Sequence, residues 1–187
     1  MSQPEQKRDY PVSDIRHFLE PGPVVLVSSR WEHQTDIMTM GWHMVMEFSP
    51  SLVGCIIAPG NHSHDLIRNS GECVINIPEA SLVDTVVGIG NCSGSDADKF
   101  SQFNLTPGQS VKVRAPLIDE CYASFECRLY DDAMVDLYSL FIFEVVKAHV
   151  APSADHQQSL HYQGMGQFML SGKSIDRKDL FTSGKLN

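Results

Sequence analysis

The sequence predicts a mainly β protein with helices inserted between two groups of strands, arranged as a Greek-key barrel in one domain. Residues 24–58 contain three strand-like segments joined by short connections, which favours an antiparallel meander. Residues 61–103 carry helix signals, and the final third returns to strand-like alternation. Many antiparallel strands with helices inserted at one place are typical of this class of barrel.

Length and charge limit the possible partners. The chain has 187 residues, enough for one domain with a sizeable core, so we expect a single domain over residues 1–187 with an N-terminal arm and a C-terminal tail. The formal net charge is −9 and the basic residues are scattered, which argues against nucleic acid as a partner. No apolar run approaches membrane-spanning length, and the N-terminus lacks an apolar signal region. We therefore expect a cytoplasmic protein with no membrane partner.

Five cysteines occur at irregular spacing, and no Cys-x-x-Cys pair is among them. Three lie in strand-like apolar runs, where a cysteine is usually a small buried hydrophobe. We therefore expect reduced and mostly structural thiols.

The segment Ile37–Phe48 has the clearest pattern in the chain. Its even-numbered face is large and apolar, which predicts one continuous strand with that face packed on a core. The even-numbered residues are Met38, Met40, Trp42, Met44, Met46 and Phe48. The other face has a small hydroxyl at Thr39 and no side chain at Gly41. Because a glycine inside a strand often marks a close approach to the backbone, Thr39–Gly41 predicts the floor of a flat slot.

The other elements follow from turn residues, caps and apolar runs. In the first third we expect a loose arm over residues 1–12, a short helix over Asp14–Leu19, strands over Val24–Val27 and Leu52–Ala58, and a polar hairpin connection over Ser28–Asp36. In the middle we expect a helix from Asn61 or Ser63 to about Ser70 with Gly71 as its left-handed stop, a strand over Glu72–Ile77, helical spacing over residues 82–87, a loop over 91–96 and a short helix over 97–103. In the final third we expect a loop over 105–110, strands over Val111–Arg114, Tyr122–Tyr130 and Leu137–Val150, a turn over 131–136 and a linker over 151–158.

The segment Asn61-His62-Ser63-His64 begins the first helix of the middle region. A helix N-terminus attracts phosphate through its free N–H groups and its dipole, although plain helix capping explains the same residues. His62 and His64, with the distant His149, also suggest a metal site. The segment lacks the carboxylate that such a motif needs, which argues against a metal.

Hydrolytic and dinucleotide motifs find no support in the sequence. No Gly-x-Ser-x-Gly turn occurs. The glycine pairs at 88 and 90 and at 164 and 166 lack a surrounding Rossmann unit.

Several segments, taken together and in order, resemble the flavin reductase-like family, whose members have an FMN-binding split β-barrel and include flavoredoxin. The resemblance covers roughly residues 20–168, and the flavoredoxin-like branch fits best. The matching segments are Pro23–Ser28, Met38–Trp42, Phe48–Val53, Ile57–Ile67, Gly71–Ile77, Ser93–Phe100, Ala115–Cys121 and Leu140–His149.

The resemblance implies non-covalent FMN, with no metal and no catalytic acid–base pair. The strand at 38–42 would line the isoalloxazine ring, and the segment at 61–64 would hold the phosphate. The region at 93–100 would lie near the cofactor or a dimer partner, and the tail at 161–168 would close over the site. The implied cofactor-binding residues are Met38, Thr39, Met40, Gly41, Trp42, Pro59, Gly60, Asn61, Ser63, His64, Ser93, Lys99, Phe100 and His161.

Three positions depart from the family pattern. Asp36 stands where the family usually has Asn, Met40 where it has a small residue, and Gly60 near where it often has a basic one. These departures affect the expected ring and phosphate contacts.

The resemblance implies an FMN-dependent oxidoreductase that uses NADH or NADPH to reduce flavin or another small acceptor. A partner monooxygenase would be a further possible acceptor. One alternative is an FMN-bearing electron carrier or flavin-binding protein without nicotinamide turnover. Another is a split barrel that has lost flavin and binds a different ligand.

A homodimer is expected on separate grounds. The predicted strand Leu137–Val150 is apolar on both faces, and a barrel interior covers only one of them. Because a large exposed apolar patch is rare on a monomer, we expect helices or a second subunit on the other face, most simply in a two-fold homodimer.

Overall fold

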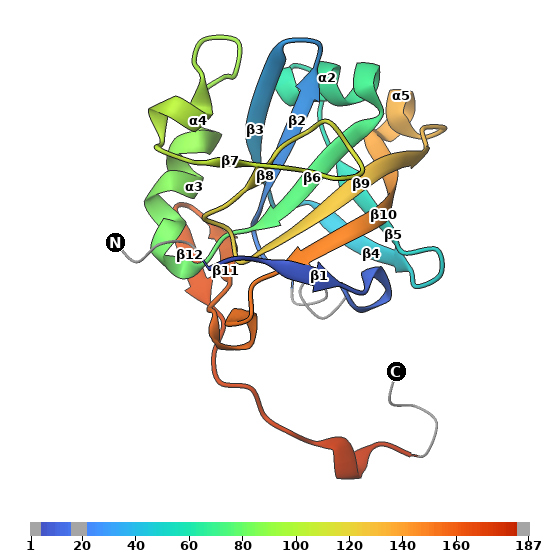
Figure 1. The fold of residues 1–187 in the computed structure, drawn as a ribbon, viewed down its shortest axis with the longest axis vertical. Helices are drawn as coiled ribbons and strands as arrows, with labels where there is room; N and C mark the ends of the chain where they lie inside the picture. Colours follow the sequence, from blue (N-terminus) through green and yellow to red (C-terminus); the bar gives the residue numbers. More distant parts are fainter. Residues whose placement is uncertain (1–4, 16–21, 183–187) are drawn as a thin grey trace.

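The computed structural model describes residues 5–15 and 22–182, and its centre is one antiparallel sheet (Figure 1). Seven strands lie in the order β3-β2-β6-β9-β10-β5-β4, and β1 pairs with the free part of β10. The strands are β1 Arg8–Tyr10, β2 Val25–Trp31, β3 Gln34–Met40, β4 His43–Glu47, β5 Leu52–Ile56, β6 Glu72–Ile77, β9 Ala123–Asp131 and β10 Leu140–Val150. The predicted mainly β architecture with inserted helices is confirmed.

The two ends of the sheet are neighbours in the chain. Only Gly41 and Trp42 separate β3 from β4. Three Cα steps span no more than about 11 Å, so the ends of these two strands must lie close together. The sheet therefore curls into a barrel that is open along the boundary between β3 and β4.

The prediction of one continuous strand over Ile37–Phe48 is wrong. The strand ends at Met40 and a new one begins at His43. Met40 is buried, at 4% exposed, whereas Trp42 is 74% exposed. The break reverses which alternate residues face the core, so Val45 points inward on β4. The predicted core contact is therefore wrong for Trp42, Met44, Met46 and Phe48, all of which are exposed.

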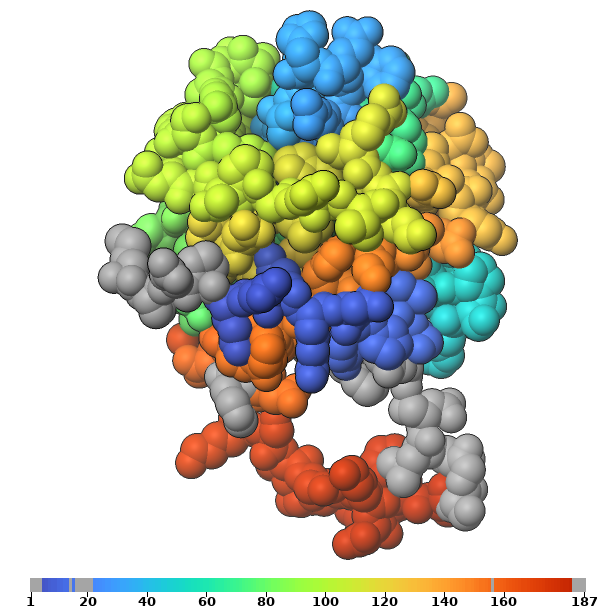
Figure 2. All heavy atoms as spheres, in the orientation of Figure 1, coloured from blue at the N-terminus to red at the C-terminus, as the bar shows by residue number. Residues whose placement is uncertain are grey.

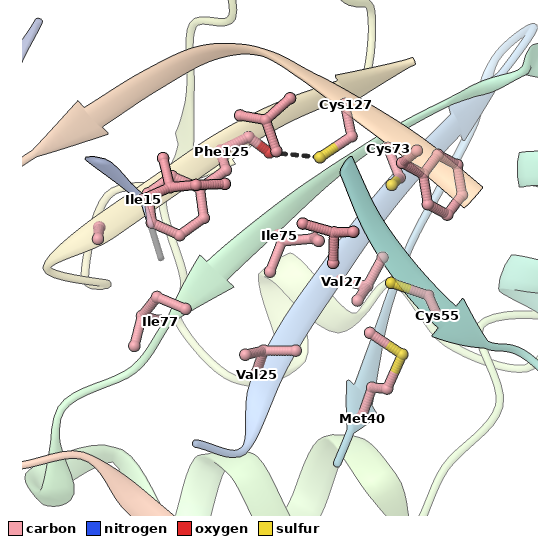
Figure 3. Close-up of a cluster of buried hydrophobic side chains, with 14 of the residues drawn as sticks. Ile15, Val25, Val27, Met40, Cys55, Cys73, Ile75, Ile77, Phe125 and Cys127 are labelled. Atoms are coloured by element: carbon pink, nitrogen blue, oxygen red, sulfur yellow. Dashed lines mark hydrogen bonds between the residues drawn. The ribbon is translucent and has the colours of Figure 1, made fainter. Parts of the chain in front are cut away.

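Two apolar cores lie on opposite sides of the sheet. Inside the barrel, alternate residues of β6 and β9 such as Cys73, Ile75 and Phe125 pack against β2, β5 and β10 (Figure 3). Outside it, Leu26 and Ile37 pack beneath helix α3. All five cysteines are free thiols and four are buried.

The helices are short and lie on the outside of the sheet (Figure 1). They are α2 His62–Ser70, α3 Val83–Gly90, α4 Lys99–Gln102 and α5 Val135–Tyr138. The expected stop of α2 is confirmed, because Gly71 has a φ of 67° and its N–H donates to the Ile67 carbonyl at 2.8 Å. Within the described residues, none of the helices is long and apolar enough to cross a membrane.

Several element boundaries differ from the predictions. β2 extends to Trp31 and β3 begins at Gln34. The connection predicted over Ser28–Asp36 is therefore only a two-residue turn. β10 begins at Leu140, because Leu137 and Tyr138 belong to α5. The predicted helix Asp14–Leu19 lies, from residue 16 onward, outside the described residues.

The two terminal regions have more structure than predicted. Part of the predicted loose arm pairs with β10 as β1. The tail forms a hairpin of β11 Leu160–Gly164 and β12 Gln167–Leu170, after which residues 171–182 extend away from the body (Figures 1 and 2).

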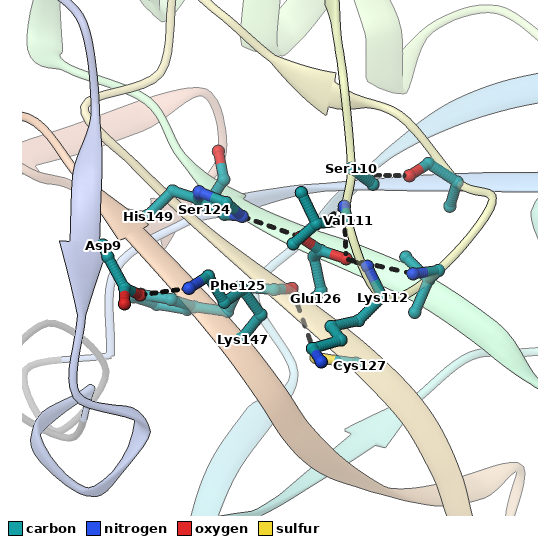
Figure 4. A network of polar contacts seen from close by, with 12 residues as sticks. Asp9, Ser110, Val111, Lys112, Ser124, Phe125, Glu126, Cys127, Lys147 and His149 are labelled. Carbon is teal, nitrogen blue, oxygen red and sulfur yellow. Dashed lines mark hydrogen bonds and ion pairs between the residues drawn. The ribbon is translucent and has the colours of Figure 1, made fainter.

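The strand predicted over Val111–Arg114 is also wrong, because this segment forms a loop whose backbone donates hydrogen bonds to one buried carboxylate (Figure 4). The N–H groups of Val111, Lys112 and Val113 donate to the fully buried Glu126 of β9 at 2.5 to 3.0 Å. His149 adds a hydrogen bond at 2.7 Å. Two short strands, β7 Pro107–Gly108 and β8 Leu117–Ile118, flank this loop.

These contacts fix the charge of Glu126. Burial alone raises the pKa of its carboxyl group, but the hydrogen bonds from His149 and the three backbone N–H groups outweigh burial and lower the pKa below its ordinary value. Because the folded-state pKa is lowered, the carboxylate stabilises the fold fully above the ordinary pKa of 4.5. This stabilisation is lost as the pH falls through the folded-state pKa.

Glu126→Gln keeps the shape of the side chain but replaces one acceptor by an amide donor that faces N–H groups. We expect the free energy of unfolding at neutral pH to fall by about 2–4 kcal/mol, since hydrogen bonds to a charged group are worth roughly 1.5–3 kcal/mol each. Urea unfolding at about pH 7 and about pH 3.5 measures this difference in the free energy of unfolding between wild type and variant, and the difference should be smaller in acid. An equal gap at both pH values would contradict a role for the charge.

Candidate functional site

A cleft of about 730 Å³ opens beside the edge of the sheet. Three chain segments wall it: the β2–β3 hairpin, the start of α2, and the loop that leads into α4. Its size is within the range typical of small-molecule and cofactor sites, about 300–1,000 Å³. The lining residues are Arg30, His33, Gln34, Thr35, His62, Gly94, Ser95, Asp96, Ala97, Asp98, Phe100, Pro107 and Pro116.

A buried polar cluster lies directly behind these walls. Asp36 of β3, only 2% exposed, accepts a hydrogen bond from the Ser63 hydroxyl at 2.6 Å through Oδ2. Its Oδ1 lies 3.1 Å from the ammonium of Lys99, which is 4% exposed and also donates to the Ile37 carbonyl at 2.6 Å. We call Asp36, Ser63 and Lys99 the ion-pair cluster.

The ion-pair cluster joins the three walls of the cleft. In each wall, a residue that lines the cleft is followed directly by a cluster residue: Thr35 by Asp36, His62 by Ser63, and Asp98 by Lys99. The contacts of the cluster therefore fix the distances between the hairpin, α2 and the loop before α4. The shape of the cleft depends on one buried carboxylate.

The start of α4 places Lys99 and Phe100. Asp98 is its N-cap, and its carboxylate accepts from the Phe100 N–H at 3.1 Å and the Ser101 hydroxyl at 2.7 Å. These hydrogen bonds, that of the Ser101 side chain above all, lower the pKa of Asp98. The sequence Asp98-Lys99-Phe100 thus sends Lys99 inward to Asp36 and Phe100 to the cleft.

The expected slot at Thr39–Gly41 is only partly open. The Thr39 hydroxyl donates to the Val86 carbonyl of α3 at 2.7 Å, so α3 covers this side chain. Met38 is half-buried and Met40 lies in the barrel core. Among the described residues, no atom lies within 4 Å of an ideal Cβ placed on Gly41. α3 therefore lies against one side of the half-buried Thr39, and the position with open space is Gly41.

His43, which follows the exposed Trp42, is held in its neutral form. Its Nε2–H donates to the Pro23 carbonyl at 2.7 Å, and Nδ1 is buried with no hydrogen-bond partner among the described residues. Burial lowers the pKa of this imidazole, so His43 is an uncharged group at neutral pH.

The loop before α2 is exposed. Pro59, Gly60 and Asn61 all lie in it, and the Asn61 amide donates to the Ala58 carbonyl at 3.0 Å rather than capping the helix. Gly60 has a φ of 96°, a left-handed conformation that a side chain would strain. This backbone requirement accounts for a glycine at position 60.

Of the predicted cofactor-binding residues, Phe100 lines the cleft and the others lie beside or away from it. Three of these have contacts elsewhere. His64 is buried edge-on against Phe141, with ring centroids 5.5 Å apart. The Ser93 hydroxyl lies 2.8 Å from that of Ser95. His161 contacts Ser159 on the tail hairpin at 3.0 Å.

Sequence reasoning missed the hairpin wall. Arg30, His33 and Thr35 lie in the segment interpreted as a polar connection, and His62 was considered only as a metal ligand. The polar and basic residues beside the hairpin turn could have indicated a wall of the cleft, but they match no known binding motif.

Comparison with known proteins decides the family. The model of the flavin reductase-like domain matches residues 17–168. The chain belongs to this family. The predicted resemblance and the split-barrel fold are both confirmed.

Other members and neighbours agree with this assignment. An uncharacterized protein of Archaeoglobus fulgidus is 31% identical over 153 residues, covering 81% of this chain and 86% of that protein. The FMN-binding domain of a flavin reductase-like enzyme from Shewanella baltica superposes with a TM-score of 0.85 at 24% identity, covering 95% and 100% of the two chains. Flavoredoxin of Desulfovibrio vulgaris superposes with a TM-score of 0.76 at 22% identity, covering 88% and 93%.

Gly94 separates the cleft of this flavin reductase-like domain from the ion-pair cluster. An ideal Cβ on Gly94 would lie 2.1 Å from Oδ1 of Asp36. Because Asp36 is held by two partners, we expect Gly94→Ala to displace the loop and to lower the free energy of unfolding by about 1–3 kcal/mol. Gly41→Ala, where the space is open, is the matched control and should change it by less than about 0.5 kcal/mol. Equal effects in thermal unfolding would show that Gly94 does not pack against the carboxylate in this way.

Proposed function

We propose that this flavin reductase-like domain binds FMN non-covalently and acts as an oxidoreductase that uses NADH or NADPH to reduce flavin or another small acceptor. The observation that carries the proposal is the cleft beside β3 and the start of α2, in a chain of this family. The Shewanella protein, which is similar in fold, is an FMN-binding domain, and this likeness supports the same cofactor here.

The cleft fits FMN in size, and its basic groups lie on two of its three walls. Arg30, His33 and His62 on the hairpin and α2 walls can bind an anion, whereas Asp96 and Asp98 line the wall before α4. The first turn of α2, beginning at His62, adds the positive end of a helix dipole. We therefore assign the phosphate to the end of the cleft at α2.

The ring is assigned to the other end of β3. Gly41 leaves its backbone uncovered, and the exposed Trp42 follows it. FMN supplies the redox chemistry when bound, while the chain contributes binding, orientation and electrostatics. A catalytic acid–base pair is therefore not required of this chain.

The protein should purify yellow and release FMN on denaturation, and NADH or NADPH should be oxidised when FMN and an acceptor are present. Flavin absorbance, chromatography of the released cofactor and nicotinamide absorbance measure these three properties. A protein that holds FMN but leaves both nicotinamides unoxidised is the electron carrier instead. A colourless protein that does not quench FMN fluorescence on titration would refute FMN binding.

Gly41→Val locates the ring independently. Valine favours strands, and the space at this position is open, so the fold should keep its thermal stability. A side chain placed where the ring lies should weaken FMN binding by about tenfold or more, roughly 1.4 kcal/mol. Equal losses of stability and of flavin affinity would instead assign Gly41 a packing role.

We further propose that the working unit is a homodimer. In the sheet, Gly54 of β5 is paired with Met44 of β4 on one side and with Ile142 of β10 on the other, and Ile56 is paired with Leu140. These pairs place apolar residues on the outer face of β4, β5 and β10. Gly54 has no side chain, and an ideal Cβ there would lie 2.8 Å from Met46 Sδ and 3.3 Å from Leu140 Cδ1.

This outer face is the surface that a partner would cover. Met44 and Met46 are 51% and 43% exposed, and Trp42 and Phe48 extend the patch along β4. A contiguous apolar patch rarely stays exposed on a monomer, and a two-fold dimer is the commonest way to cover one.

Met44→Lys should convert the dimer to monomers, because the new charge would lie inside the covered face. Val111→Lys is the matched control, since Val111 is equally apolar and exposed but lies in the loop held by Glu126. Sedimentation at micromolar concentration should show dissociation for the first variant only. A wild-type monomer would contradict the proposed dimer, whereas flavin titration tests FMN binding separately.

A further inference from the structure

We propose that Asp36 is an internal counter-ion that occupies Ser63 and Lys99, two of the side-chain donors that the family resemblance assigns to the FMN site. The anionic end of the cofactor is then held by other groups, and Asp36 determines how strongly this chain prefers FMN to riboflavin. The inference rests on the proposed FMN binding for its ligand, but the state of the ion-pair cluster can be tested without flavin.

The donors are already used within the protein. The hydroxyl of Ser63 has one hydrogen to donate, and it is directed to Asp36 Oδ2 at 2.6 Å. The ammonium of Lys99 is directed to the Ile37 carbonyl at 2.6 Å and to Asp36 Oδ1 at 3.1 Å. All three side chains are buried, at 0%, 4% and 2% exposed for Ser63, Lys99 and Asp36. A phosphate group would therefore find the Ser63 hydrogen already used, and at Lys99 it would compete with the Ile37 carbonyl and the paired Asp36 carboxylate.

Charge leads to the same conclusion. The ammonium and the carboxylate neutralise each other in a buried environment, where charges interact strongly. A phosphate brought to Lys99 would lie beside the Asp36 carboxylate and would be repelled by it. An asparagine at this position, the residue usual in the family, would leave the ammonium without a counter-ion. A buried unpaired charge is strongly unfavourable, so the ammonium would then favour an anion from outside.

The cleft lies close enough to Lys99 for an external anion to replace the Asp36 carboxylate as its counter-ion. Gly94 lines the cleft and also packs against the Asp36 carboxylate, so a single layer of backbone separates the two. Asp98, the residue before Lys99, lines the cleft as well. An anion in the cleft therefore needs only a displacement of the loop at Gly94 to reach the ammonium.

Asp36→Asn tests the proposal, with Asp36→Asn combined with Lys99→Met as the matched control. Thermal unfolding is followed in inorganic phosphate and in chloride at equal ionic strength. We expect phosphate to stabilise Asp36→Asn beyond any effect on the wild type, and the added Lys99→Met to abolish this gain. In flavin fluorescence titrations, Asp36→Asn should raise the preference for FMN over riboflavin by about tenfold, as one added contact to a charged group predicts.

Two results would overturn the proposal. One is an Asp36→Asn protein without phosphate-specific stabilisation whose affinities for FMN and riboflavin fall together, which would make the cluster purely structural.

The other comes from Ser63→Ala, which also serves if Asp36→Asn does not fold. We expect Ser63→Ala to leave the ratio of the two flavin affinities unchanged, because its hydroxyl serves Asp36. A selective loss of FMN affinity would place the phosphate on Ser63. If the wild type binds neither flavin, the proposed function fails while the phosphate comparison still decides the role of Asp36.

Discussion

The two-residue link between β3 and β4 is the constraint on which the rest of the structure depends. Gly41 and Trp42 join strands at opposite ends of the sheet order, so the sheet must curl until its ends meet. Closure creates an interior that the alternate residues of β6 and β9 fill. Even-numbered residues such as Met40 face the core before the link, whereas after it Met44 and Met46 face outward. One short connection thus sets the barrel, the apolar outer face and the open backbone position at Gly41.

Two buried carboxylates then fix what the apolar core leaves undetermined. Burial of apolar area favours compactness but is not directional, whereas a carboxylate that receives several hydrogen bonds accepts only one arrangement of its neighbours. Glu126 holds the loop at 111–113 against one face of the sheet. Asp36 holds α2 and the start of α4 against β3. In both cases a charge that is costly to bury is kept because segments distant in the sequence supply its partners.

The sequence predicted the features that depend on local periodicity and local caps. The strands at 72–77 and 123–131, the left-handed stop at Gly71 and the family were all available from short-range patterns. The reversal at Gly41 was not, because an unbroken apolar alternation runs through it and only closure of the barrel interrupts it. The loop at 111–113 and the orientation of Ser63 and Lys99 depend on partners 13 to 63 residues away in the chain. The sequence predicted Ser63 and Lys99 at one site, and the structure brings both side chains to Asp36, a partner inside the protein.

The proposed cofactor site and the proposed dimer face share the same strand connection. Gly41 faces the space assigned to the ring, and Trp42, the next residue, begins the exposed apolar patch that continues through Met44 and Met46. A partner that covers this patch would therefore also approach the position assigned to the ring. The hairpin and α2 walls of the cleft, at the other end of β3, are tied instead by Asp36, within one chain. Assembly and the ion-pair cluster would then control opposite ends of one ligand, the first by covering the ring and the second by setting the charge that its phosphate meets.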